Sequence, residues 1–249
     1  MIPIASEAVF VGVLVLCRVG SCMMLLPGFG STRIPMQFRA LLAVAISLTL
    51  LPFLYEQGAA ATRQAGEIGR PMLLGGEMLN GLTIGLLARL FLVALSFSAS
   101  ILTNVIGLAP TPGVPIDDVE AAPPLVNLIS LTATMLVFAT NLHHELIRAL
   151  IASYDALKIS SPIDMGWYLD QILERLGQTS ELALRLCGPF IVYAIIVNLA
   201  IGFANKFTPQ ISVYFITTGM VAAGGLFLIY FTIDDWFGLF LQDFSSWLK

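Results

Sequence analysis

The stretch LCGPFIVYAIIVNLAIGFAN (186–205) contains no charged side chain, and FTPQISVYFITTGMVAAGGLFLIYFTI (207–233), which follows it, contains none either. A helix needs about 20 predominantly apolar residues to cross the hydrocarbon core of a bilayer, and each stretch is long enough. Apolar runs of this length are too long for the strands or core helices of a soluble domain. The two stretches therefore predict an all-α integral membrane protein.

The composition of the whole chain agrees with this prediction. Of 249 residues, 57% are hydrophobic and only 11% are charged, and the mean hydropathy is +0.89. The net charge of −4 is unsuited to nucleic acid, because phosphate contacts require clustered Lys or Arg. We therefore expect membrane lipid as a partner and exclude nucleic acid.

Apolar runs and the proline and glycine residues between them predict a series of helices in a single domain, 1–249. The polar, Gly- and Ala-rich stretch 56–70 is expected to separate two of them. A helix over 71–106 would be about 50 Å long, which exceeds the hydrocarbon thickness of about 30 Å, so part of it must leave the bilayer. The expected helices are approximately 4–27, 36–55, 71–106, 125–154, 162–178, 183–205, 211–233 and 235–248.

Two of these helices carry mixed polar and apolar residues. Ser161 and Pro162 suit the N-cap and the first position of a helix over 162–178. The apolar residues of this helix fall on one face. We expect this helix to lie on a surface. The segment 235–248 interleaves aromatic residues with serine and aspartate, which predicts an amphipathic helix at the membrane interface.

The stretch GLAPTPGVPIDDVEAAPP (107–124) contains five prolines and cannot form regular helix or sheet. It is predicted to be a long irregular loop. Its acids Asp117, Asp118 and Glu120 can be interpreted as a proton relay or a calcium site, but no EF-hand pattern flanks them, so solvated loop acids are favoured.

The cluster His143, His144, Glu145 and Arg148 is the nearest approach to a catalytic or metal site. Adjacent histidines point about 100° apart on a helix and cannot share one metal unaided, so a role at a helix end or an interface is favoured. Three cysteines, Cys17, Cys22 and Cys187, are interpreted as small buried hydrophobes. Phosphate-loop, nucleophile-elbow and zinc-protease motifs are lacking, so we expect no enzyme, catalytic residue, cofactor or metal site.

Charged residues inside the apolar helices need an explanation. Arg18, Glu77 and Arg89 are costly there unless each faces water or a partner. A salt bridge between helices or subunits is favoured over a transport site. Gly81 and Gly85 have the G-x-x-x-G spacing that permits close helix packing, although this spacing is frequent by chance.

Several motifs, taken in order, resemble the FliR family, the flagellar relatives of the SctT subunits of type III secretion systems. They cover essentially the whole chain and comprise RVGSCMMLLPGFGSTRIPMQFRALLAVAISLTLLP (18–52), GEMLNGLTIGLL (76–87), the irregular loop, NLISLTATMLVFATNLHHELI (127–147) and PFIVYAIIVNLAIGFANKFTPQISVYFI (189–216). The resemblance implies helical hairpins that stack with partner subunits into a helical export gate.

The resemblance also implies a function. Such a subunit, together with FliP-like and FliQ-like gate subunits and an FlhB-like switch protein, forms part of a channel for unfolded proteins in transit. Its place is the bacterial inner membrane, at the flagellar basal body or the base of a type III secretion system, with a projection to the periplasmic side. Pore-plug positions implied by the resemblance are Ile106, Gly107, Leu108, Pro110, Pro112, Gly113, Val114 and Pro115. Polar positions expected inside the membrane or at interfaces are Arg18, Arg39, Glu77, Arg89, Asn198, Asn205, Lys206 and Gln210.

A different class of function remains as an alternative, namely a stand-alone transporter of protons or small solutes. In that case Glu77, Arg89 and the acidic loop would line the substrate path. Transporters often show inverted repeats and broken helices at mid-membrane, and neither is evident in the sequence. A third class, a membrane-bound enzyme, would need a catalytic constellation that the sequence lacks.

Overall fold

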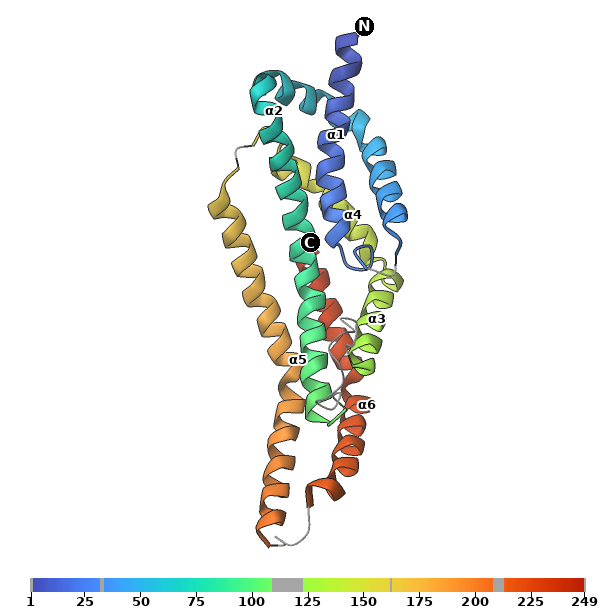
Figure 1. The fold of residues 1–249 in the computed structure, drawn as a ribbon, viewed down its shortest axis with the longest axis vertical. Coiled ribbons are helices and arrows are strands. Elements are labelled where there is room, and N and C mark those ends of the chain that lie inside the picture. Colours follow the sequence, from blue (N-terminus) through green and yellow to red (C-terminus); the bar gives the residue numbers. More distant parts are fainter. Residues whose placement is uncertain (1, 32–33, 109–122, 162, 208–212, 249) are drawn as a thin grey trace. The chain divides into compact units, whose positions relative to one another are not determined.

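The computed structural model describes residues 2–31, 34–108, 123–161, 163–207 and 213–248 (Figure 1). Within these ranges every regular element is a helix, as the sequence predicts for an all-α protein. The helices are α1 (Ile2–Leu25), α2 (Met36–Val105), α3 (Pro124–Ala139), α4 (Leu142–Ala156), α5 (Met165–Phe207) and α6 (Val213–Leu248).

The expected break at 56–70 is a kink at Gly66, and the residues on either side of this glycine stay helical within α2. Ala, Glu, Gln and Arg are good helix formers, so a polar composition exposes a helix without ending it. The one departure from helical geometry in α2 is Gly66, whose φ of 61° and ψ of −170° bend the chain. This is a conformation that glycine adopts readily. Figure 1 shows α2 turning sharply in this region.

Three further boundaries differ from the expectation. The helix predicted over 125–154 is divided at Asn141, which has a left-handed backbone with φ of 60° and separates α3 from α4. Asparagine is among the few residues that tolerate this conformation. Conversely, the helices predicted over 162–178 and 183–205 are joined in α5, and those over 211–233 and 235–248 are joined in α6. At those junctions Ser180, Glu181, Asp234 and Asp235 are exposed without interrupting the helix.

The described residues group into two compact units, each with its own core. Unit 1 contains Met1–Leu90 and Val137–Leu176, and unit 2 contains Phe91–Leu136 and Gly177–Trp247. In unit 1 the core follows one stripe of α1, where Val11, Leu14, Val15 and Val19 are all inaccessible to solvent. Their spacing of three and four residues is that of one helix face.

The core of unit 2 is largely aromatic. Phe91 contacts both Phe244 and Trp247, and Phe240 stacks on Phe244 at a centroid distance of 5.9 Å. The Nε1–H group of Trp236 donates a hydrogen bond to the carbonyl of Leu186 at 2.9 Å. The prediction of an interfacial helix over 235–248 is therefore wrong for this aromatic face, because its rings are buried against α2 and α5.

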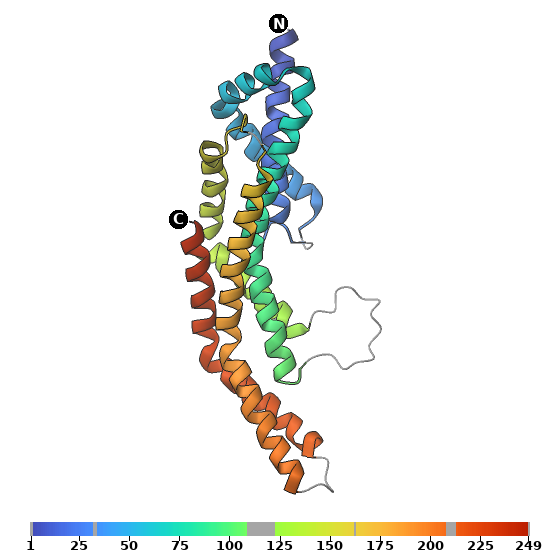
Figure 2. The same cartoon turned by 90° about the vertical axis from the view of Figure 1, so that its left-hand side faces the viewer.

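Beyond this core, α5 and α6 form a hairpin within unit 2 (Figure 2). Tyr193 crosses it and donates to the carbonyl of Val221 at 2.7 Å, directly over Gly224. The outer faces of this hairpin carry large exposed hydrophobic residues, which include Ile195, Leu199, Phe203, Phe227 and Phe231. Such a surface requires lipid or another protein to cover it.

Four helices in the described part of the chain are long and apolar enough to cross a membrane: α1, α2, α5 and α6. The pair α3 and α4 makes a fifth if it is counted as one broken span. The most apolar windows of α5 and α6 are only 17% buried within the protein, against 39% and 44% for α1 and α2. The α5–α6 hairpin is thus the most dependent on an apolar environment.

Candidate functional site: the Arg18–Glu77 network

Two glycines bring the backbones of α1 and α2 into contact. A Cβ atom at Gly81 would overlap the carbonyl oxygen of Arg18, and one at Gly85 would lie 2.8 Å from the carbonyl oxygen of Cys22. Any larger residue would push the helices apart, which is the physical use of small residues in membrane helix packing. The G-x-x-x-G spacing therefore serves packing inside this chain, and it sets the side chain of Arg18 beside α2.

Arg18 is completely buried, and its hydrogen bonds engage every nitrogen of the guanidinium group. Its Nε and Nη2 groups donate to the two carboxylate oxygens of Glu77, each at 2.8 Å. Nη1 donates to the carbonyl and hydroxyl oxygens of Ser153 at 3.1 and 3.3 Å, and Nη2 also donates to the carbonyl of Leu157 at 2.7 Å. Five donors meet five acceptors, which is the full capacity of arginine.

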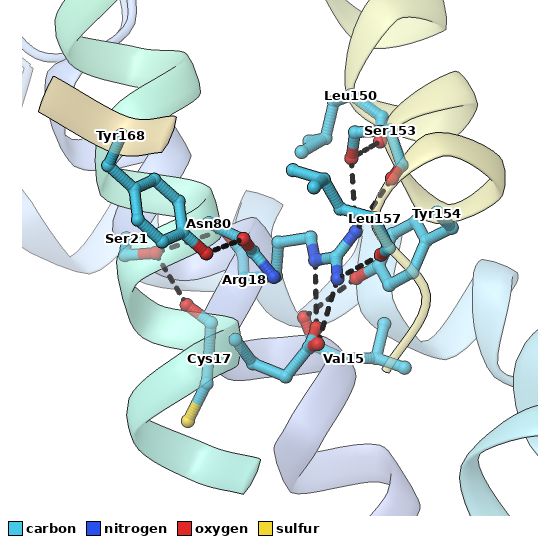
Figure 3. A network of polar contacts seen from close by, with 11 residues as sticks. Val15, Cys17, Arg18, Ser21, Asn80, Leu150, Ser153, Tyr154, Leu157 and Tyr168 are labelled. Carbon is cyan, nitrogen blue, oxygen red and sulfur yellow. Dashed lines mark hydrogen bonds and ion pairs between the residues drawn. The ribbon is translucent and has the colours of Figure 1, made fainter. Parts of the chain in front are cut away.

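The same arginine closes the C-terminal end of α4 (Figure 3). The last carbonyls of a helix lack partners within it and carry a partial negative charge, so a guanidinium group there is favourable. The guanidinium carbon also lies 4.0 Å from the ring centre of Tyr154, in cation–π geometry. Arg18 thus joins three helices, α1, α2 and α4, around one buried positive charge.

The arrangement suits a structural role. Glu77 is 1% exposed, and Arg18 occupies both of its oxygens, so its carboxylate lacks the exposed oxygen that a substrate or metal would need. Removal of one partner from a buried ion pair typically costs about 3–5 kcal/mol, because the other charge is stranded. The network therefore stabilises one arrangement of the three helices.

A second polar contact lies one turn further along α2. The hydroxyl of Tyr168, at the start of α5, donates to Oδ1 of Asn80, and both side chains are buried. Between α2 and the link from α4 to α5 is a cavity of about 260 Å³, bordered by Glu77, Asn80, Tyr168 and Ser161 among others. Arg18 and Asn80 therefore hold the two ends of this link.

The C-terminal end of α2, in unit 2, is also sharply defined. Gly107 has a φ of 73°, its N–H bonds the carbonyl of Asn104, and the N–H of Leu108 bonds the carbonyl of Thr103. These two bonds form a Schellman motif, which ends the helix. Ile106 is fully buried against Gly225 of α6, where a Cβ atom would overlap its side chain. The start of the proline-rich loop is thus anchored to the α5–α6 hairpin.

Comparison with known proteins assigns the chain to a family. Residues 9–247 match the family described as "Bacterial export proteins, family 1". The chain belongs to this family. It is 27% identical over 223 residues to "Flagellar biosynthetic protein FliR" of Caulobacter vibrioides (strain ATCC 19089 / CIP 103742 / CB 15), covering 89% of this chain and 87% of that relative. A protein of the same description from Aquifex aeolicus (strain VF5) is 23% identical over 239 residues, covering 93% and 91%.

The structure distributes the predicted polar residues of this export-family chain very unevenly. It joins Arg18 to Glu77, 59 positions away, but leaves Arg89 exposed. Arg39 is half-buried, with Nη1 4.0 Å from the sulfur of Met24. Three further predicted residues are exposed on α5, namely Asn198, Asn205 and Lys206, and Gln210 lies outside the described residues.

The structure describes only some of the predicted plug positions. Ile106, Gly107 and Leu108 are described and form the Schellman end of α2. Pro110, Pro112, Gly113, Val114 and Pro115 lie outside the described residues, as do the loop acids Asp117, Asp118 and Glu120.

The histidine cluster lies at a helix end. His143 and His144 are in the first turn of α4, because the helix predicted over 125–154 is interrupted at Asn141. Their rings lie 4.0 Å apart, and His143 also contacts Phe138. Arg148 pairs with Glu145 at 2.8 Å. Within the described ranges no group of three His, Cys, Asp or Glu side chains is placed to hold a metal.

The cysteines match the interpretation of small hydrophobes. Cys22 and Cys187 are buried, Cys17 is half-buried, and all three are free thiols. They take part in no disulfide.

Sequence reasoning missed several members of the network. Ser153 and Leu157 contribute backbone carbonyls, which leave no signature in the residue types. Asn80 had a usable signal, because it follows Glu77 by three positions and helical periodicity puts both on one face. Its partner Tyr168 had none, since only the folded chain brings α5 to α2.

Proposed function

We propose that this chain is a non-enzymatic subunit of the flagellar protein-export gate, and that it forms part of the channel through which unfolded substrates cross the inner membrane. The observation that carries the proposal is the family match over residues 9–247, together with relatives described as flagellar biosynthetic protein FliR. These relatives favour a flagellar system over a virulence-associated one.

The proposed partners are FliP-like and FliQ-like gate subunits and an FlhB-like switch protein, in a complex that projects to the periplasmic side at the flagellar basal body. Exposed apolar faces support an assembled state. The start of α5 exposes Trp167, Leu169 and Leu173, and the α5–α6 hairpin is mostly uncovered within the chain. Partner helices or lipid must cover this surface.

Copurification tests the assembly. The tagged chain is solubilised from its own cells in mild detergent, and the proteins that accompany it are identified by mass spectrometry. We expect FliP-like and FliQ-like proteins in stable association, whereas a tagged membrane protein of unrelated function from the same cells should lack them. A chain that is monodisperse and accompanied by neither protein would contradict the proposal.

We further propose that residues 107–124 act as a plug that prevents ion leakage until a substrate displaces it. Irregular backbone at membrane depth is tolerated only where protein or a water-filled lumen surrounds it. The described ends of the loop support a fixed position, because Gly107 terminates α2 sharply and Pro124 begins α3. Both ends belong to unit 2.

Deletion of residues 111–120 tests the plug. In planar bilayers containing the assembled gate, we expect the deletion to raise ion conductance above that of the wild-type gate. A variant in which the same residues are replaced by a Gly/Ser linker of equal length separates loss of contacts from shortening. If both variants copurify with their partners and conduct as the wild type does, the plug assignment is wrong.

The alternative of a stand-alone transporter rests on the buried carboxylate of Glu77 and its neighbouring cavity. Two observations weaken it: Arg18 occupies both oxygens of Glu77, and Arg89 is exposed. Solute or proton uptake by proteoliposomes that contain this chain alone would favour the transporter.

A further inference from the structure

A pocket in unit 1 combines two arginines with an apolar wall, and the function proposed above makes no use of it. It lies between the first turns of α1 and the bend of α2 and has a volume of about 480 Å³, within the range of small-molecule sites. Its lining consists of Ser6, Glu7, Val9, Phe10, Val13, Thr62, Arg63 and Arg70.

The cationic side of the pocket is formed where α2 bends. Arg63 and Arg70 flank Gly66, whose left-handed backbone redirects the helix between them. The guanidinium of Arg70 lies 5.6 Å from the ring centre of Phe10 on α1, which orients it toward the pocket. Its Nη1 is 3.9 Å from Glu67, too long for a hydrogen bond, so this acid does not occupy its donors.

Arg63 is only partly neutralised. Its Nε and Nη2 donate to the carboxylate of Glu7 at 2.7 and 3.1 Å, while Nη1 makes neither of these bonds. The lining therefore holds two positive charges and one negative charge. Arginine donors in this arrangement match a phosphodiester, whose oxygens accept paired N–H groups.

The opposite side is apolar and follows α1. Val9 and Val13 are four positions apart, on one face of the helix, and are 68% and 40% exposed. Because α1 is apolar enough to span a membrane, this stripe can face lipid. An apolar stripe that ends at a pair of arginines is complementary to an amphiphile, with the arginines facing its anionic head and the stripe facing its apolar chain.

We propose that this pocket binds one anionic phospholipid, with its phosphodiester on Arg70 and the Nη1 group of Arg63 and an acyl chain along Val9 and Val13. Glu7 limits the affinity, because its carboxylate competes with the phosphate for Arg63. The site is independent of the export role, since it requires only that α1 and α2 contact lipid.

The test measures lipid retained by the purified full chain. The protein is incorporated into nanodiscs of phosphatidylcholine with a minor fraction of phosphatidylglycerol, re-extracted, and analysed for bound lipid by native mass spectrometry. Wild type should be enriched in phosphatidylglycerol. Arg70→Gln should lower this enrichment about fivefold, the effect typical of one basic residue at a membrane surface.

Glu7→Gln should change the enrichment in phosphatidylglycerol in the opposite direction. It frees Arg63 from its competitor, so the enrichment should rise about fivefold. Arg185→Gln is the matched control, because Arg185 is an exposed arginine paired with Glu181 in unit 2 and is remote in sequence from this pocket. It should leave retention unchanged. Thermal unfolding of each variant checks that the fold is retained.

Three results would overturn the proposal. Retention by Arg70→Gln equal to that of wild type would exclude the arginine contact, and lower retention by Glu7→Gln would exclude the competition. Binding of inorganic phosphate by wild type without any enrichment in phosphatidylglycerol would identify a site for free phosphate instead of a lipid.

Discussion

The strongest quantitative prediction concerns the coupling of Arg18 to Glu77. Arg18→Met strands a carboxylate that is 1% exposed, and Glu77→Leu strands a guanidinium that is 0% exposed. Each stranded charge should lower the free energy of unfolding by about 3–5 kcal/mol. The double variant strands neither charge.

The two carbonyls that Arg18 serves, those of Ser153 and Leu157, are lost in both Arg18→Met and the double variant. The cost falls mainly on Leu157, about 1–3 kcal/mol if its carbonyl stays unsatisfied, because the carbonyl of Ser153 keeps its hydrogen bond from the N–H of Leu157. This cost cancels from the double-mutant cycle. What remains is the sum of the two stranding costs, about 6–10 kcal/mol. Even half of this is far above the deviation of about 0.3–0.5 kcal/mol expected for independent sites.

The assay is reversible unfolding of the purified chain in mixed detergent micelles, with wild type, both single variants and the double variant compared under one condition. The exposed pair Arg148 and Glu145 supplies the control cycle, because its side chains are 75% and 45% exposed. A coupling of at most about 0.5 kcal/mol is expected there. If the Arg18–Glu77 cycle were additive within error, the ion pair would not stabilise the arrangement of α1, α2 and α4 as described above.

Two substitutions test the close contacts at glycine. Gly81→Ala should destabilise the chain by about 1–3 kcal/mol in the same assay, because its methyl group meets the backbone of Arg18, whereas Gly75→Ala, in open space, should be neutral or stabilising. Equal effects at the two positions would refute the packing argument. Gly225→Ala should likewise destabilise unit 2, because its methyl group meets the side chain of Ile106. Adding Ile106→Ala to this variant should recover part of the lost stability, measured as resistance to proteolysis near Gly107. No recovery would show that this contact does not limit stability.

Much of the fold could be anticipated from local composition. Charge-free runs long enough to cross a bilayer predict helices whatever their neighbours are, because an unsatisfied backbone group in hydrocarbon is prohibitively costly. The termination of α2 near Gly107 was equally local, since glycine readily takes the left-handed conformation that the Schellman motif requires. The helix ends expected at residues 55 and 71 were mispredicted, because polarity reports exposure and not helix ends, and the chain bends only at Gly66. The break at Asn141 was missed, because its left-handed backbone leaves no signal in the hydrophobic pattern.

The candidate site likewise has one part that the residue types determine and one part that only packing determines. That Arg18 and Glu77 each need a partner follows from their residue types and apolar surroundings, which the chain alone determines. That they are each other's partner, and that the same guanidinium holds the carbonyls of Ser153 and Leu157, was decided only when α1, α2 and α4 packed together. The cost of a buried charge is a property of the residue and its local environment, whereas its compensation depends on atoms as many as 139 positions away, which packing alone brings within reach.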